Sequence, residues 1–231
     1  VIYFECPGLS LLKTLFPTLN IFLQIEHTLL KPESGISSNA LDGNLLLPEG
    51  NGSYLVRIAE YEKLKTADII FDYSRINLLN IKSAPSLKRF SQKIYCVSPS
   101  LYPICTNAKN RIGIITLFGN PNASRRKKFL DMLRRHNIEY QNILGVYFGV
   151  NKIYQNTKIV VNIRQTDNYD TLEELRVLPA LRSGAIVVCE SAPYVKKTAY
   201  SKFIIWGSLH DLPKIITEIE ENYEEVHRNI F

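Results

Sequence analysis

The sequence predicts an α/β protein made of two tandem, doubly wound halves with mostly parallel sheets and a cleft between them. Short β-branched apolar runs, such as residues 159–161 and 185–188, are typical of parallel strands buried on both faces. Amphipathic stretches separate these runs, and this βα rhythm is Rossmann-like. A segment with two prolines, residues 98–110, interrupts the rhythm. We therefore expect one domain over residues 1–106 and a second over residues 107–231.

The composition is that of an ordinary globular protein, with 231 residues of which 45% are hydrophobic and 22% charged. The formal charge of +6 suits an anionic ligand, and it equally suits solubility. The four cysteines form no CxxC pair, so we expect reduced, buried thiols rather than a zinc site. No apolar run reaches the roughly 18 residues that a membrane span needs. We expect a soluble, cytoplasmic protein, cut from a larger multidomain chain because it opens at Val1 rather than at Met.

In the first half, apolar runs that end in polar residues predict parallel strands. These strands are expected at residues 1–5, 20–27, 67–74 and 93–99. Helical patterns are expected at residues 9–20, 53–67 and 77–90. Residues 31–52 are rich in Gly, Ser, Asn and Pro and are expected to form a long irregular insertion.

The second half repeats the pattern. Strands are expected at residues 111–119, 142–149, 158–165, 185–190 and 201–207, and helices at 124–136, 171–183 and 211–230. Asp170 and Glu173 fit a capping box, and Gly184 fits a left-handed residue that ends the helix. Asp211 fits the N-cap of the last helix, with Pro213 in its first turn.

The start of the helix at 124–136 is strongly basic. Arg126 shares the inward face of the helix with Phe129 and Leu133, whereas Arg125 and the two following lysines are expected to point elsewhere. Cations at a helix N-terminus oppose the macrodipole, so Arg126 indicates an anion nearby. The alternative for the cluster as a whole is a solvated basic surface.

The helix at 171–183 offers unpaired N–H groups to a phosphate at its N-terminus. Arg176 lies close to its apolar face, where it can bind diphosphate or ribose oxygens, or pair with Glu173 three residues earlier. Glu174 faces away from the apolar face and is expected to be open to a ligand or water.

Polar residues also follow several strands, at the edge where ligands bind in open α/β sheets. In the second half these include Asn162 and Arg164. In the first half they are Glu5, Glu26, His27, Asp72, Tyr73 and Arg75. A carboxylate or an imidazole in such a place can accept a proton from a hydroxyl group, although each one taken singly is more often structural.

Several motifs are absent from the sequence. It has no GxGxxG after a strand, so the sequence gives little support for classical dinucleotide binding. It has no GxxxxGK[ST], which excludes a P-loop. It has no DxD, HExxH or GxSxG either. A metal-bound diphosphate site therefore has no anchor in the sequence.

Three runs of the second half, at residues 125–136, 146–165 and 172–191, resemble the donor-binding domain of GT-B-type glycosyltransferases, in that order. Residues 20–27 and 61–78 resemble the acceptor half, and similar domains occur in multidomain viral and bacterial glycan-building proteins. The chain departs from many retaining members at Pro179, where they carry the second glutamate of an E-x7-E pattern. The resemblance therefore implies neither ribose binding by that route nor retention of configuration.

The resemblance implies an enzyme that moves a sugar from a nucleoside diphospho-sugar to a glycan hydroxyl, without metal or cofactor. UDP is the favoured nucleotide, and the sugar is expected to be a hexose or a deoxyhexose. The implied acceptor base is Asp72, His27 or Glu26. The implied donor-binding residues are Arg126, Arg176, Arg164, Asn162, Glu173, Glu174, Gly119 and Asn120.

Two alternatives stay open. The chain can be a non-catalytic module that binds a sugar nucleotide or a nucleic acid, although its basic residues are not interleaved with stacking aromatics, so nucleic acid is not the expected partner. A different Rossmann-type enzyme, such as an epimerase, lacks its glycine fingerprint here.

Overall fold

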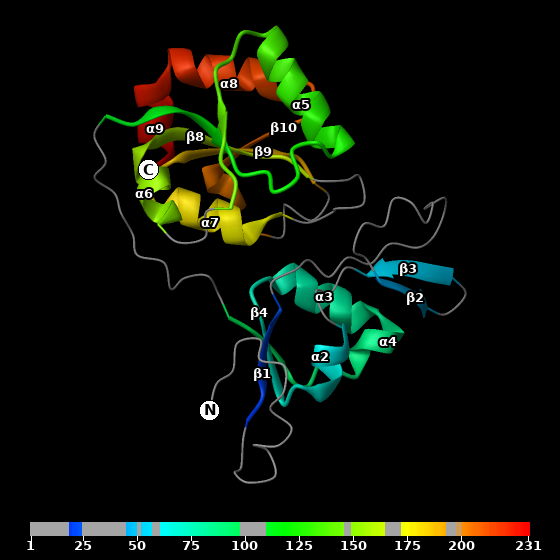
Figure 1. Cartoon of the computed structure of the whole chain (residues 1–231). Helices are drawn as coiled ribbons and strands as arrows, with labels where there is room; N and C mark the ends of the chain where they lie inside the picture. The colour runs from blue at the N-terminus through cyan, green and yellow to red at the C-terminus, as the bar shows by residue number, and fades with distance from the viewer. Residues whose placement is uncertain are drawn as a thin grey trace. The chain divides into compact units, whose positions relative to one another are not determined.

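The computed structural model describes residues 19–24, 45–49, 52–56, 61–97, 110–145, 149–164, 172–192, 198 and 200–231. The chain divides into two compact units, Val1–Ser98 and Pro99–Phe231 (Figure 1). The division falls at the start of the segment in which the sequence placed a boundary. Each unit is described here by itself, and the cleft expected between them stays a prediction.

The first unit contains a parallel three-stranded sheet. Its strands are β1 (Ile21–Gln24), β4 (Ile69–Asp72) and β5 (Ile94–Cys96), in the order β1-β4-β5. The same unit contains the helices α2 (Tyr61–Thr66), α3 (Arg75–Ser83) and α4 (Pro85–Lys88). Apolar side chains of the strands and helices, among them Ile70, Ile81 and Leu87, form one core. The strands expected at 20–27, 67–74 and 93–99 are confirmed in β1, β4 and β5, whereas the strand expected at 1–5 and residues 9–18 of the expected helix lie outside the described residues.

Two helix predictions in this unit are wrong. Residues 53–67 do not form one helix, because β3 (Gly52–Val56) pairs antiparallel with β2 (Leu45–Glu49). The run SYLV suits a strand as well as a helix, and an apolar partner strand within the expected irregular insertion decides between the two. The helix expected at 77–90 is split at Ala84, whose extended backbone is the conformation that a following proline favours.

The second unit contains a five-stranded, wholly parallel sheet in the order β10-β9-β8-β6-β7. The strands are β6 (Ile112–Thr116), β7 (Gln141–Asn142), β8 (Thr157–Asn162), β9 (Ile186–Glu190) and β10 (Ile204–Gly207). From β6 the chain goes first to one side, to β7, and then to the other side, to β8. The strand order therefore reverses between β6 and β8, which is the topological switch point of this sheet.

Helices cover both faces of this sheet (Figure 1). Helices α5 (Ser124–Arg135) and α8 (Leu212–Glu221) pack on one face, and α6 (Val150–Asn156) and α7 (Glu174–Arg182) pack on the other. Alternate strand residues supply the two cores, since Val161 faces α5 and α8 while Val160 faces α6 and α7. The protein is thus α/β, and its sheets of three and five strands are parallel, in agreement with the mostly parallel sheets that the sequence predicts.

The helix boundaries in the second unit are partly as expected. Helix α5 begins at Ser124, as predicted. Helix α7 ends in a Schellman motif, with Gly184 at φ +77° and hydrogen bonds from its N–H to Leu181 and from the Ala185 N–H to Ala180. The capping box is wrong, because Glu173 rather than Asp170 is the N-cap.

Three further details differ from the expectation. Of the strand expected at 142–149, only Asn142 lies in a strand within the described residues, in the two-residue β7, while residues 146–148 lie outside them, and α6 follows where no helix was predicted. The last helix is divided at Asn222 into α8 and α9 (Tyr223–Ile230). Cys189 is buried, as expected, but Cys96 is exposed. Among the described residues, no helix has both the length and the apolar character that crossing a bilayer requires.

Candidate functional site

The second unit gathers its polar residues at the carboxyl edge of the sheet, where β6, β8 and β9 end. Asn162 and Glu190 are the last residues of β8 and β9, and both are buried. Helix α5 follows the loop after β6, and its first turn lies at the same edge, as the contact described next shows. Because the strand order reverses between β6 and β8, this edge is the place where sheets of this kind bind ligands.

Glu190 binds two arginines from different segments. Arg125, in the first turn of α5, donates through Nε to both carboxylate oxygens, at 3.0 and 3.1 Å, and also through Nη2 to Oε1. Arg164, just after β8, donates through Nη2 to Oε1 and through its backbone N–H to Oε2, each at 3.2 Å. We call Arg125, Arg164 and Glu190 the edge cluster.

The edge cluster presents cations outward over a buried anion. The side chain of Glu190 is 3% exposed, whereas those of Arg125 and Arg164 are 18% and 16% exposed. Burial by itself would raise the pKa of Glu190, but the hydrogen bonds from Arg125 and Arg164 outweigh it and hold the pKa below its usual 4.5. Glu190 is therefore ionised at neutral pH, and two guanidinium groups on one carboxylate leave an excess positive charge.

Arg176, in the first turn of α7, reaches the end of the neighbouring strand β8. Its Nη1 donates to Oδ1 of Asn162 at 2.8 Å and is 3.8 Å from Oε2 of Glu173. The structural pairing with Glu173 that the sequence allowed is therefore present, in a loose form. The stronger contact fixes the guanidinium on β8, next to the switch point.

Arg126 faces inward, as its position on the apolar face predicts. It is 4% exposed, and its Cζ lies 4.9 Å from the centroid of the Phe118 ring. The expectation that Arg125 points away from the site is wrong. In the first turn of a helix a long side chain leans back beyond the N-terminus, so Arg125 reaches the end of β9.

The anion that the dipole argument requires is also present. Arg125 and Arg126 both place positive charge at the N-terminus of α5, which the macrodipole disfavours. The carboxylate of Glu190 lies against Arg125 there and offsets this cost. The protein thus supplies at least one anion of its own at this position.

The expectation that Glu174 is open to ligand or water is wrong. Glu174 is only 7% exposed. Burial, together with the neighbouring Glu174 carboxylate, raises the pKa of Tyr200. Tyr200 lies in a distant part of the sequence, so the periodicity of α7 gives no sign of this cover. Glu173, by contrast, is partly exposed at the start of α7.

Gly119 and Asn120 are exposed in the loop between β6 and α5. Oδ1 of Asn120 accepts a hydrogen bond from the Asn122 N–H at 3.1 Å, which shapes the turn before the helix. Their predicted contact with the donor stays a prediction.

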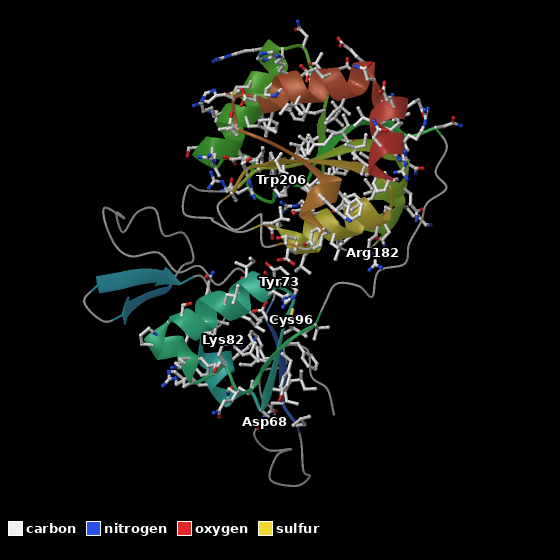
Figure 2. The ribbon with its side chains drawn as sticks, turned by 180° about the vertical axis from the view of Figure 1, so that it is seen from behind. Asp68, Tyr73, Lys82, Cys96, Arg182 and Trp206 are labelled. Atoms are coloured by element: carbon white, nitrogen blue, oxygen red, sulfur yellow. The ribbon has the colours of Figure 1, made fainter. Side chains whose placement is uncertain are left out.

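The candidate acceptor base in the first unit is Asp72, the last residue of β4. Its side chain is fully buried, and Oδ1 accepts hydrogen bonds from the Ser74 N–H and from Nδ2 of Asn77, both at 2.9 Å. These contacts fix the turn into α3 and are a structural role. Figure 2 shows Tyr73 and Cys96 at this end of the sheet and Asp68 at the other. Glu26 and His27 lie outside the described residues.

Comparison with known proteins assigns the chain to no family. No protein-family model matches the chain, and no curated protein matches it. Within the described parts of the chain, no group of three or more His, Cys, Asp and Glu side chains is placed to hold a metal ion.

Two arginines and one glutamate, Arg125, Arg111 and Glu190, make contacts in the second unit that the sequence patterns did not predict. Glu190 satisfies the rule that selected Asn162, a polar residue that ends a buried strand, and could have been chosen by it. Arg111, just before β6, is 6% exposed and donates to the carbonyls of Tyr154, Thr157 and Ser183. It lies at the amino edge of the sheet, opposite the edge cluster, and its role is structural.

Proposed function

We propose that the chain is a glycosyltransferase that needs no metal ion, and that its second unit binds the diphosphate of a nucleoside diphospho-sugar at the carboxyl edge. UDP is the favoured nucleotide. The acceptor is a glycan hydroxyl, and its base is one of Asp72, His27 and Glu26. The resemblance of the sequence to GT-B-type donor domains and the parallel α/β fold both support this proposal.

The observation that carries the proposal is the edge cluster at the switch point. Two partly exposed guanidinium groups lie over a carboxylate that is 3% exposed, so the charge offered to solvent there is positive. Guanidinium groups bind phosphate oxygens in a two-pronged geometry, which makes arginine well suited to a diphosphate. Arg176, held by Asn162 on β8, adds a third cation near the same edge.

The same arrangement supports transfer chemistry. When the bond between sugar and diphosphate breaks, negative charge grows on the leaving diphosphate. Arginines that are already held by hydrogen bonds stabilise that charge with little reorganisation, which is the main source of electrostatic catalysis. The acceptor hydroxyl must lose a proton to a base, and a carboxylate or an imidazole is the group that accepts it.

Ligand-induced thermal stabilisation tests the proposal. UDP, GDP and dTDP are added separately in the presence of a chelator, and at least one is expected to raise the unfolding temperature. Replacing Arg125 or Arg164 by Gln is expected to abolish the shift, whereas Lys128→Gln, an exposed cation on the same helix, is expected to preserve it. Absence of any shift in the wild-type protein would refute the proposal.

A basic groove favours a second candidate function, the binding of a nucleic acid. A cavity of about 540 Å³ along the outer side of α5 is lined by Ser124, Lys127, Lys128, Asp131, Met132, Arg135, His136 and His210. Binding of a random oligonucleotide that weakens steeply with salt, and weakens further in Lys127→Gln and Lys128→Gln, would favour this function. The glycosyltransferase proposal predicts no such binding.

A further inference from the structure

We propose that Glu190 is a positioning residue that holds Arg125 and Arg164 in the orientation in which they bind the donor diphosphate. This inference rests on the proposed function. It assigns a role to a carboxylate inside a site meant for an anion, where negative charge by itself opposes binding.

The contacts of Glu190 fit a positioning role. Arg125 binds the carboxylate through two nitrogens, with Nε donating to Oε2 and Nη2 donating to Oε1, and two parallel hydrogen bonds of this kind fix the plane of the guanidinium group. Arg164 is fixed at two points, by its side chain and by its backbone N–H. One carboxylate thus sets the relative position of two cations that lie on separate segments of the chain.

The support for Glu190 is rigid. Every residue of β9, Ile186–Glu190, is buried, and the strand is hydrogen-bonded to β8 on one side and to β10 on the other. A carboxylate at the end of a central strand moves little, and sites built on strands hold their geometry better than sites on loops. Arg125 is at a helix start and Arg164 follows a strand, so each of them gains order from this anchor.

A purely electrostatic role of Glu190 and a positioning role predict opposite effects of its replacement on the affinity for a diphosphate. If the residue acted on a bound diphosphate through its charge alone, removing that charge would strengthen binding, because like charges repel. If it positions the two arginines, the same change weakens binding. The sign of the change in affinity therefore separates the two roles, and a purely structural role would lower stability without changing affinity in the folded protein.

The experiment measures the dissociation constants of UDP and of inorganic pyrophosphate by titration calorimetry. Glu190→Gln keeps the size of the side chain and removes its charge. Glu190→Asp keeps the charge but shortens the side chain by one methylene group, which moves the carboxylate away from the two arginines. Both variants are expected to bind the two probes more weakly, on the order of tenfold, the lower end of the loss that follows when a residue that orients metal ligands is replaced. Glu139→Gln, which removes an exposed carboxylate from the same unit, is the matched control and is expected to bind like the wild type.

The outcomes separate the two proposals. If wild-type protein binds neither UDP nor pyrophosphate, the proposed function fails and this inference fails with it. If the wild type binds and folded Glu190→Gln binds equally well or more tightly, the positioning role is refuted while the proposed function stands. Circular dichroism reports whether each variant folds. Should Glu190→Gln not fold, Glu190→Asp decides, and unchanged affinity in that variant overturns the inference.

Discussion

Arg125 and Glu190 are 65 positions apart in the sequence, yet Nε of the arginine lies 3.0 and 3.1 Å from the two carboxylate oxygens. The pair joins the first turn of α5 to the end of β9, across the edge at which the strand order reverses. It places a fixed cation at the edge where open α/β sheets bind their ligands.

The first prediction concerns the pH dependence of stability. The pKa of Glu190 in the folded protein lies below its usual 4.5, so its contribution is complete above 4.5 and is lost as pH falls through the folded value. Glu190→Gln is expected to lower the free energy of unfolding by about 3 kcal/mol at neutral pH, as the loss of one partner of a buried ion pair does. The difference should shrink in acid. Urea unfolding of both proteins over a pH series measures it, and a difference that stays constant in strong acid contradicts the assignment.

The second prediction concerns Arg111, which bonds three carbonyls at the amino edge of the sheet. Arg111→Met leaves buried acceptors without a donor and is expected to lower the free energy of unfolding by about 3 kcal/mol. The affinity of the folded fraction for UDP should not change. Denaturant unfolding and calorimetry measure the two quantities. A loss of affinity as large as that of Arg125→Gln would show that the two edges of the sheet are coupled.

Arg126 is the subject of the third prediction. Because it is 4% exposed and stacks on Phe118, truncation removes packing as well as charge. Arg126→Ala is expected to lower the free energy of unfolding by about 2 kcal/mol. Lys127→Ala, an exposed neighbour, should change it by less than about 0.5 kcal/mol. Equal stability of the two variants in thermal unfolding would contradict the buried placement of Arg126.

The fourth prediction tests Asp72 as the acceptor base. Asp72→Asn keeps an oxygen that can accept from Ser74 and Asn77, so stability is expected to fall by no more than about 1 kcal/mol. If Asp72 is the base, sugar transfer should slow by about a hundredfold or more. Turnover with a donor found in the nucleotide screen measures this effect. Unchanged turnover would leave the role to His27 or Glu26.

Much of the fold follows from local patterns. The apolar runs that became β8 and β9 are buried on both faces along almost their whole length, and a run of that kind has few alternatives to a central parallel strand. Gly184 marks a helix end because its φ of +77° is costly for other residues. Where a segment is short or ambiguous, its partners decide. Residues 52–56 became a strand because residues 45–49 offered an edge with which to pair.

The site was harder to predict than the fold, because its contacts join distant segments. The rule of polar strand ends located Asn162 and Arg164 at the carboxyl edge. Helical periodicity misjudged Arg125, because a side chain in the first turn reaches beyond the helix. It also misjudged Glu174, which is buried and lies close enough to Tyr200, in another part of the chain, to raise the pKa of that tyrosine. No pattern within a single helix reports either contact.

The strand order has a consequence for how the second unit is made on the ribosome. β6 is synthesised first and is an interior strand of the finished sheet. Each later strand pairs with an edge strand: β7 on one side of β6, and then β8, β9 and β10 in succession on the other side. No strand has to be inserted between two that are already paired. The sheet can therefore assemble outward at the pace of translation, and Glu190 comes to lie beside an α5 that has already emerged.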